Sequence, residues 1–229
     1  MNHRTVDRPW LSYVAPMAAF LILTALEGLL PRRDGQVAPL AYASAYGIKA
    51  VLVTAVAWAC RSTWRDLLPR PSVLVLAVSA ALGVAVAALW VGLDGKVPPL
   101  PLTEKRAAFD PGQLPTAART VFLAVRFYGL VLLVPLVEEL FWRSFLVRWI
   151  VHQDFRQVTI GRVTPLAAAV TAGLFALAHP EWLPALITGL LWVGLLRWSR
   201  SVAACFVSHL VANVGLGAWI LAHEAWHLW

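Results

Sequence analysis

The sequence predicts an all-α polytopic membrane protein, a bundle of seven or eight transmembrane helices around a polar intramembrane cavity. Hydrophobic residues make up 60% of the 229 positions and charged residues only 14%, and the mean hydropathy is +0.70. A soluble domain is nearer half apolar and a quarter charged. Apolar runs of about the length that crosses a bilayer also follow one another along the chain. We therefore treat residues 1–229 as one integral-membrane domain, with a motif-bearing core over about 120–222.

The apolar runs place the helices in order. They are Trp10–Leu30, Pro39–Cys60, Ser72–Leu93, Thr120–Ile150, Thr164–His179, Leu183–Trp198 and Val202–Ala222. The fourth run is too long for one straight span, so an eighth helix forms if it breaks. The fifth and sixth are short, and Pro180 and Pro184 between them end one helix and start the next. The proline-rich segment Asp94–Arg119 is expected to be a surface loop, with a short amphipathic helix around Thr103–Phe109.

Charge and cysteine usage narrow the class of protein. The net charge is +7, but the basic residues fall between apolar runs, which is typical of loops at a charged membrane surface and argues against nucleic-acid binding. Ten Lys and Arg residues fall on one side of a seven-span arrangement and six on the other, which predicts a cytoplasmic N-terminus. The two cysteines have no CxxC or Cys/His spacing, so neither a disulfide framework nor a structural zinc is expected.

Aromatic and ionisable residues near the span ends have ordinary interpretations. The tryptophans near these ends are expected to anchor at the headgroups; they are Trp10, Trp64, Trp149, Trp198, Trp226 and Trp229. His223 and His227 stand four residues apart, and we expect interfacial decoration there and no metal site. Glu27 and Lys49 are expected to extend toward the interface.

Three ionisable groups lie within the apolar run Val134–Arg143. Each costs about 2.5–3.5 kcal/mol to insert and usually faces a cavity or a partner. Glu139 and Arg143 stand at i and i+4 with the acid first, which is the favoured direction for an ion pair. Glu138 is rotated by about 100° from Glu139 and has no basic residue three or four positions away. The spacing therefore predicts that Glu139 braces Arg143 and that Glu138 faces the cavity.

Two later helices carry matching polar groups. His179 follows Phe175 by four residues at the end of the fifth run, and Asn213 follows His209 by four in the last run. Such groups on apolar helices converge only in a shared polar pocket. There Glu138 could act as general base toward a water, one histidine could shuttle its proton, and Asn213 with the other histidine could stabilise an oxyanion. This chemistry suits amide hydrolysis at the membrane, with no metal and no organic cofactor.

The order of these motifs resembles the CAAX prenyl protease and bacteriocin-processing family of glutamic intramembrane proteases. The matching patterns are Glu-Glu-x-x-x-Arg at 138–143, Phe-x-x-x-His at 175–179 and His-x-x-x-Asn at 209–213. The resemblance implies that the catalytic residues are Glu138 and His179, which activate water, and His209 and Asn213, which form the oxyanion hole. The residues implied to support them are Glu139, Arg143 and Phe175.

A narrower likeness concerns the substrate. The stretches Phe141–Leu146 and 179–183, with the Trp-rich tail, are similar to the bacterial subgroup named CAAX prenyl protease-related, found beside exosortase-type systems. The likeness implies a location in the bacterial cytoplasmic membrane. The implied partner besides the lipid bilayer is a peptide or protein substrate, namely a C-terminally tagged exported protein.

Other functions stay open at this point. A zinc metalloprotease would use His179, His209 and a glutamate as ligands, although the sequence lacks His-Glu-x-x-His. A thiol mechanism would pair Cys205 with His209. A transporter would use Glu27 and Lys49 in an ion path, and a scaffold would need only a structural ion pair at the glutamates.

The distance along each helix from a loop arginine to a predicted site residue indicates how deep that residue lies in the membrane. At about 1.5 Å per residue, His209 lies about 14 Å from Arg200, whereas His179 lies about 26 Å from Arg162. If the site has a single depth, either the loop Asp154–Arg162 dips into the membrane or the fifth helix is tilted or starts late.

Overall fold

The protein is a bundle of long helices in the computed structural model, which describes residues 8–33, 36–98 and 108–229. The long helical elements are α1 (Leu11–Glu27), α2 (Pro39–Ala59), α3 (Val73–Leu93), a continuous stretch over Thr116–Val151, α7 (Pro165–Leu177), α8 (Trp182–Ser199) and α9 (Val202–His223). Five of them are long and apolar enough to cross a membrane, and α1 and α7 are shorter apolar helices. The prediction of a polytopic helical membrane bundle is thus confirmed, with all seven expected runs helical.

The remaining elements are short. Strands β1 (Arg32–Arg33) and β2 (Gln36–Val37) form an antiparallel hairpin between α1 and α2. Short 3₁₀ helices are η1 (Arg61–Leu67), η2 (Pro111–Gln113), η5 (Phe155–Gln157) and η6 (Trp226–Leu228). Most of the short helix expected around Thr103–Phe109 lies outside the described residues.

The fourth apolar run does not break into two helices. It is one 36-residue helix composed of α4 (Thr116–Tyr128), η3 (Gly129–Leu133), α5 (Val134–Glu139), η4 (Leu140–Leu146) and α6 (Val147–Val151), where η3 and η4 are π-helical. π segments are rare and often mark functional sites.

The first π segment begins at a glycine for a steric reason. The Tyr46 hydroxyl of α2 packs directly on Gly129, where a Cβ atom would lie only 2.2 Å from the hydroxyl oxygen. Only a residue without a side chain allows α2 to approach the long helix at this point.

Local sequence explains where the helices begin and end. Ser72, Thr164 and Ser201 are N-cap residues whose side chains accept a backbone N–H three residues on, at the starts of α3, α7 and α9. Pro39 and Pro165 occupy first-turn positions, where a missing N–H costs nothing.

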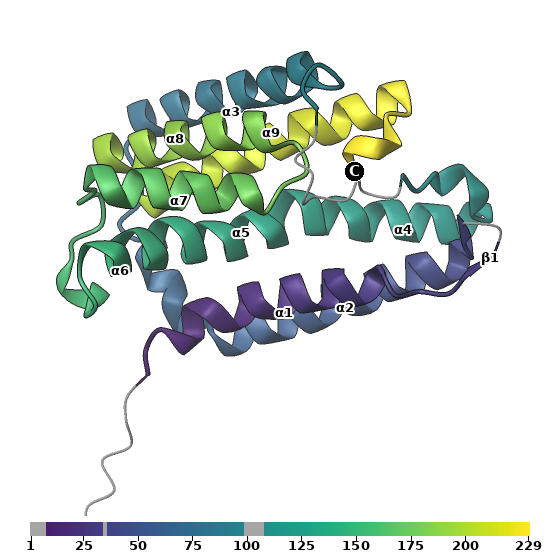
Figure 1. Cartoon of the computed structure of the whole chain (residues 1–229), viewed down its shortest axis with the longest axis horizontal. Coiled ribbons are helices and arrows are strands. Elements are labelled where there is room, and N and C mark those ends of the chain that lie inside the picture. Colours follow the sequence, from purple (N-terminus) through teal and green to yellow (C-terminus); the bar gives the residue numbers. More distant parts are fainter. Residues whose placement is uncertain (1–7, 34–35, 99–107) are drawn as a thin grey trace, which may run out of the picture.

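The helices form two groups on either side of the long helix (Figure 1). α1 and α2 pair on one side, and α3, α7, α8 and α9 pack on the other. α3 and α9 approach most closely at Gly83, where a Cβ atom would lie 2.4 Å from the Ser208 carbonyl oxygen. The long helix therefore has a separate group of helices on each side.

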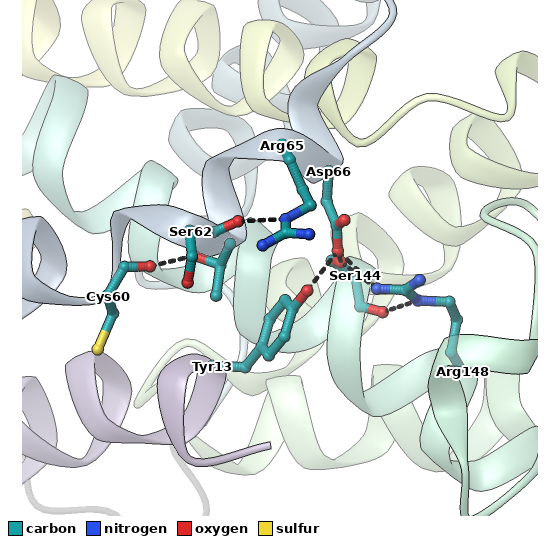
Figure 2. Close-up of polar contacts among 8 residues, drawn as sticks. Tyr13, Cys60, Ser62, Arg65, Asp66, Ser144 and Arg148 are labelled. Carbon is teal, nitrogen blue, oxygen red and sulfur yellow. Dashed lines mark hydrogen bonds and ion pairs between the residues drawn. The ribbon is translucent and has the colours of Figure 1, made fainter. Parts of the chain in front are cut away.

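A polar cluster ties α1 and η1 to the α6 end of the long helix (Figure 2). The Asp66 carboxylate of η1 accepts hydrogen bonds from the Tyr13 hydroxyl of α1 at 2.8 Å, from Ser144 and from the Arg148 guanidinium at 2.6 Å. The Asp66 and Arg148 side chains are only 12% and 8% exposed. One carboxylate thus joins α1, η1 and the segment that follows Glu138 and Glu139.

Replacing Asp66 with Asn is expected to lower the free energy of unfolding by about 3 kcal/mol, because the nearly buried Arg148 charge loses its carboxylate. The measurement is denaturant-induced unfolding of the purified protein in detergent. The matched control is Asp154→Asn, which removes an exposed Asp–Arg pair, Asp154 with Arg156 at 3.6 Å, and should cost less than about 1 kcal/mol. Equal effects of the two substitutions would contradict a structural role of the cluster.

Candidate active site

One large cavity lies between the α1–α2 pair and α3 with α9, and the long helix forms part of its wall. Its volume is about 640 Å³, and we call it the chamber. Three of the four predicted catalytic residues, His179, His209 and Asn213, line it. The polar intramembrane cavity expected from the sequence is therefore present, and the segment that follows α7 and helix α9 supply these three polar groups.

Glu138 lies on the same row of the long helix as three residues of the chamber wall. Arg126, Leu130 and Val134 line the chamber at four-residue intervals, and Glu138 is the next position in this series. Its exposed fraction is 5%. Glu138 is not among the described residues that line the chamber. The structure therefore places His179, His209 and Asn213 on the chamber surface, and Glu138 one turn beyond the last lining residue of the long helix.

Glu139 is the centre of a buried ionic network. Its Oε1 atom accepts from Arg143 Nη1 at 3.2 Å and from His209 Nδ1 at 2.9 Å. Glu139 and Arg143 are both fully buried. The ion pair predicted from the i,i+4 spacing is formed, but its link to His209 was not predicted. That contact joins α5 to α9, and the spacing of residues within one helix cannot predict a contact between two helices.

Aromatic rings surround the Arg143 guanidinium. Its central carbon lies 4.6 Å from the Phe175 ring and 5.0 Å from the Trp192 ring, which are favourable cation–π distances. Phe175 stacks on His179 at 4.5 Å, and Trp192 on His209 at 4.3 Å. The two histidines are therefore joined through two rings and one shared cation.

Trp192 is a site residue that sequence reasoning missed. It is 2% exposed, and its indole N–H donates to the Ser208 hydroxyl at 3.0 Å. The available signal was its position in the middle of α8, because headgroup anchoring explains only tryptophans near span ends.

The two histidines contact different parts of the protein. His179 packs against Trp90 at 5.7 Å, whereas the segment of α9 around His209 packs on Gly83. Both histidines and Trp90 line the chamber. The dip of the loop Asp154–Arg162 and the tilt or late start of the fifth helix stay predictions.

Hydrogen bonds fix the orientation of His179 and Asn213. His179 Nδ1 lies 2.7 Å from the Phe175 carbonyl oxygen, which can only accept, so Nδ1 carries the proton and the neutral ring has its lone pair on Nε2. Asn213 Nδ2 donates to the Leu130 carbonyl at 2.7 Å and ties α9 to η3. A primary amide has a second N–H, which Asn213 can offer to a ligand.

Several expectations at the margins of the site are wrong. Glu27 and Lys49 do not extend to the surface; they form a 2.5 Å ion pair on the chamber wall, with side chains 12% and 7% exposed. Trp229 is buried at 5% and lines the chamber. Phe109, expected in a surface loop, is 8% exposed and packs on Tyr42. All four residues are part of the chamber wall, and this is why their side chains are not at the outer surface.

Other side chains do not form the alternative sites. Cys205 is fully buried and donates to the Trp192 carbonyl at 3.4 Å, away from the chamber. His223 contacts the Trp219 carbonyl and His227 contacts Asp94, so these two histidines do not share a ligand position. Within the described part of the chain, no three His, Cys, Asp or Glu side chains are grouped to hold a metal ion.

Comparison with known families bears on the same segment. Residues 120–215 match the family described as type II CAAX prenyl endopeptidase Rce1-like, and this range contains Glu138, His179, His209 and Asn213. No curated protein and no solved structure matches the chain. Through residues 120–215 the chain is therefore similar to the CAAX protease family of membrane endopeptidases.

Proposed function

We propose that the protein is a glutamate-dependent intramembrane endopeptidase, in which Glu138 and His179 activate a water for attack on a peptide bond. His209 and Asn213 stabilise the oxyanion that forms on the attacked carbonyl. The observation that carries this proposal is the chamber, which collects His179, His209 and Asn213 at the end of the helical row that leads to Glu138.

The hydrogen bonds support separate roles for the two histidines. His179 presents Nε2 as the basic nitrogen because Nδ1 is held by the Phe175 carbonyl, and this suits proton transfer to and from water. His209 is held through Nδ1 by the Glu139 carboxylate, which leaves Nε2 to act on the substrate. The carboxylate fixes the orientation of that ring, as second-layer carboxylates do in other hydrolases.

The proposed substrate is a peptide segment of an exported or membrane-anchored protein, in line with the likeness to the exosortase-associated subgroup. The chamber wall combines apolar and aromatic side chains with a few polar groups, a composition typical of ligand-binding sites. The reaction requires water and no organic cofactor or metal.

Replacing His179 with Ala is expected to lower the rate of peptide cleavage by at least about 100-fold, the usual contribution of an acid–base group. The measurement is cleavage of a defined synthetic peptide library by the purified protein in lipid nanodiscs, read by mass spectrometry. The matched control is His223→Ala. His223 also contacts a carbonyl four residues before it, but it is exposed at the end of α9, so the control should keep full activity.

A second arm of this experiment tests the rival zinc mechanism. Exhaustive chelation should leave the cleavage rate unchanged. Activity that disappears on chelation and returns with added zinc would overturn the proposed mechanism, as would a His179→Ala protein that cleaves at the normal rate.

A further inference from the structure

The chamber extends well beyond the histidines, and its far part contains a cation. The charged side chains on its described wall, apart from the histidines, are Glu27, Lys49 and Arg126. Glu27 and Lys49 form a 2.5 Å ion pair, so their charges offset one another. Arg126 takes part in no ion pair among the described residues. Among these three side chains the guanidinium of Arg126 is thus the one without a carboxylate side chain beside it.

Aromatic rings hold the Arg126 guanidinium in place. Its central carbon lies 4.5 Å from the Tyr46 ring and 5.5 Å from the Trp229 ring. Nε is buried and has no hydrogen-bond partner within the described part of the chain. A buried guanidinium N–H without an acceptor is costly, and the planar fork of arginine matches a carboxylate with two parallel hydrogen bonds. The chemistry that fits this position is a carboxylate.

The helix sets a distance between Arg126 and the proposed catalytic groups. Asn213 binds the carbonyl of Leu130, one turn or about 6 Å along the axis from Arg126, and Glu138 is 12 residues or about 18 Å from it. An extended peptide advances about 3.3–3.6 Å per residue. An extended peptide would therefore cover the distance from Arg126 to Leu130 with about two residues, and the distance from Arg126 to Glu138 with about five residues.

We infer that Arg126 is a specificity-determining residue that binds a carboxylate of the peptide substrate and places the cleaved bond within about five residues of it. The carboxylate is either the α-carboxylate of a C-terminus or the side chain of Asp or Glu. This inference rests on the proposed endopeptidase activity and adds to it a class of substrate and a register.

The experiment uses three versions of each peptide in a synthetic library, with the full-length protein in lipid nanodiscs. The first version has a free C-terminus, the second has a C-terminal amide, and the third has the amide with one internal Asp. Cleavage positions and kcat/KM are measured by mass spectrometry. The wild-type protein should prefer a carboxylate-bearing version over the plain amide by about 10- to 100-fold, the usual contribution of a charge-assisted hydrogen bond. The cuts should lie within about five residues of the carboxylate.

The source of the carboxylate follows from which version is preferred. Preference for the free C-terminus alone identifies the α-carboxylate, and equal preference for the internal Asp version identifies a side-chain site. The Arg126→Gln protein should lose the preference and cleave the three versions with similar kcat/KM, and Arg126→Lys should keep part of the preference. The matched control is Arg119→Gln, which changes an exposed arginine two turns earlier on α4 and should behave as wild type.

The outcomes separate this inference from the function on which it rests. Peptide cleavage by the wild-type protein without preference for a carboxylate, or with a preference that Arg126→Gln retains, overturns the role of Arg126 and leaves the endopeptidase intact. A wild-type protein that cleaves no peptide of the library overturns both. The comparison of free and amidated peptides on wild type needs no variant, so a poorly folding Arg126→Gln protein would not prevent the test.

Discussion

Glu138→Gln is expected to lower peptide cleavage by at least about 1000-fold while the protein still folds and inserts. Glutamine has nearly the shape of glutamate but cannot take a proton from water, so it removes the proposed base, and general base catalysis contributes about 10² to 10⁴-fold. The Glu139–Arg143 ion pair is formed by other side chains and is not itself changed by this substitution. The rate is measured on purified protein with the peptide library.

The same substitution has an expected result in cells. A strain that carries Glu138→Gln should accumulate one exported protein in uncleaved form, which quantitative proteomics of the membrane and secreted fractions would detect. Glu224→Gln is the matched control, because Glu224 is exposed just after α9. A Glu138→Gln protein that cleaves at the normal rate would show that this carboxylate is not the base, and would favour a scaffold or transporter.

Glu139→Gln is expected to damage both stability and activity. Arg143 is fully buried and would lose its carboxylate, which should lower the free energy of unfolding by about 3–5 kcal/mol. His209 would keep only a neutral amide acceptor in place of the carboxylate that orients its ring and stabilises its protonated form, and cleavage should fall by about 100-fold or more. Unfolding in detergent and peptide cleavage measure the two effects separately.

A double variant distinguishes the two roles of Glu139. Glu139→Leu with Arg143→Met removes the buried cation along with its counter-ion, and such a replacement by apolar volume is often neutral or stabilising. The double variant should therefore regain stability yet remain inactive, because His209 is still unsupported. Recovery of activity together with stability would mean that Glu139 serves only as a counter-ion to Arg143.

The helices and part of the site follow from the sequence for a simple physical reason. Bilayer thickness sets the length of an apolar run, so α1, α2, α3 and the later spans could be predicted from hydropathy alone. Helical geometry places residues four apart on one face, so the Glu139–Arg143 pair and the Phe175–His179 contact also follow from spacing. The single long helix was harder, because its two π segments leave no mark in an apolar run.

Contacts between helices depend on which faces pack together, and spacing within one helix carries no information about that. Only the tertiary structure joins Glu139 to His209 across 70 positions, inserts Trp192 beside Arg143, and draws Lys49, Arg126 and Trp229 into one chamber wall. The sequence alone determined an all-helical membrane protein with paired glutamates and two histidine motifs. The packing of the helices decided that Glu139 supports a histidine as well as an arginine. It also placed the Arg126 guanidinium within the length of a few extended peptide residues from the proposed catalytic groups.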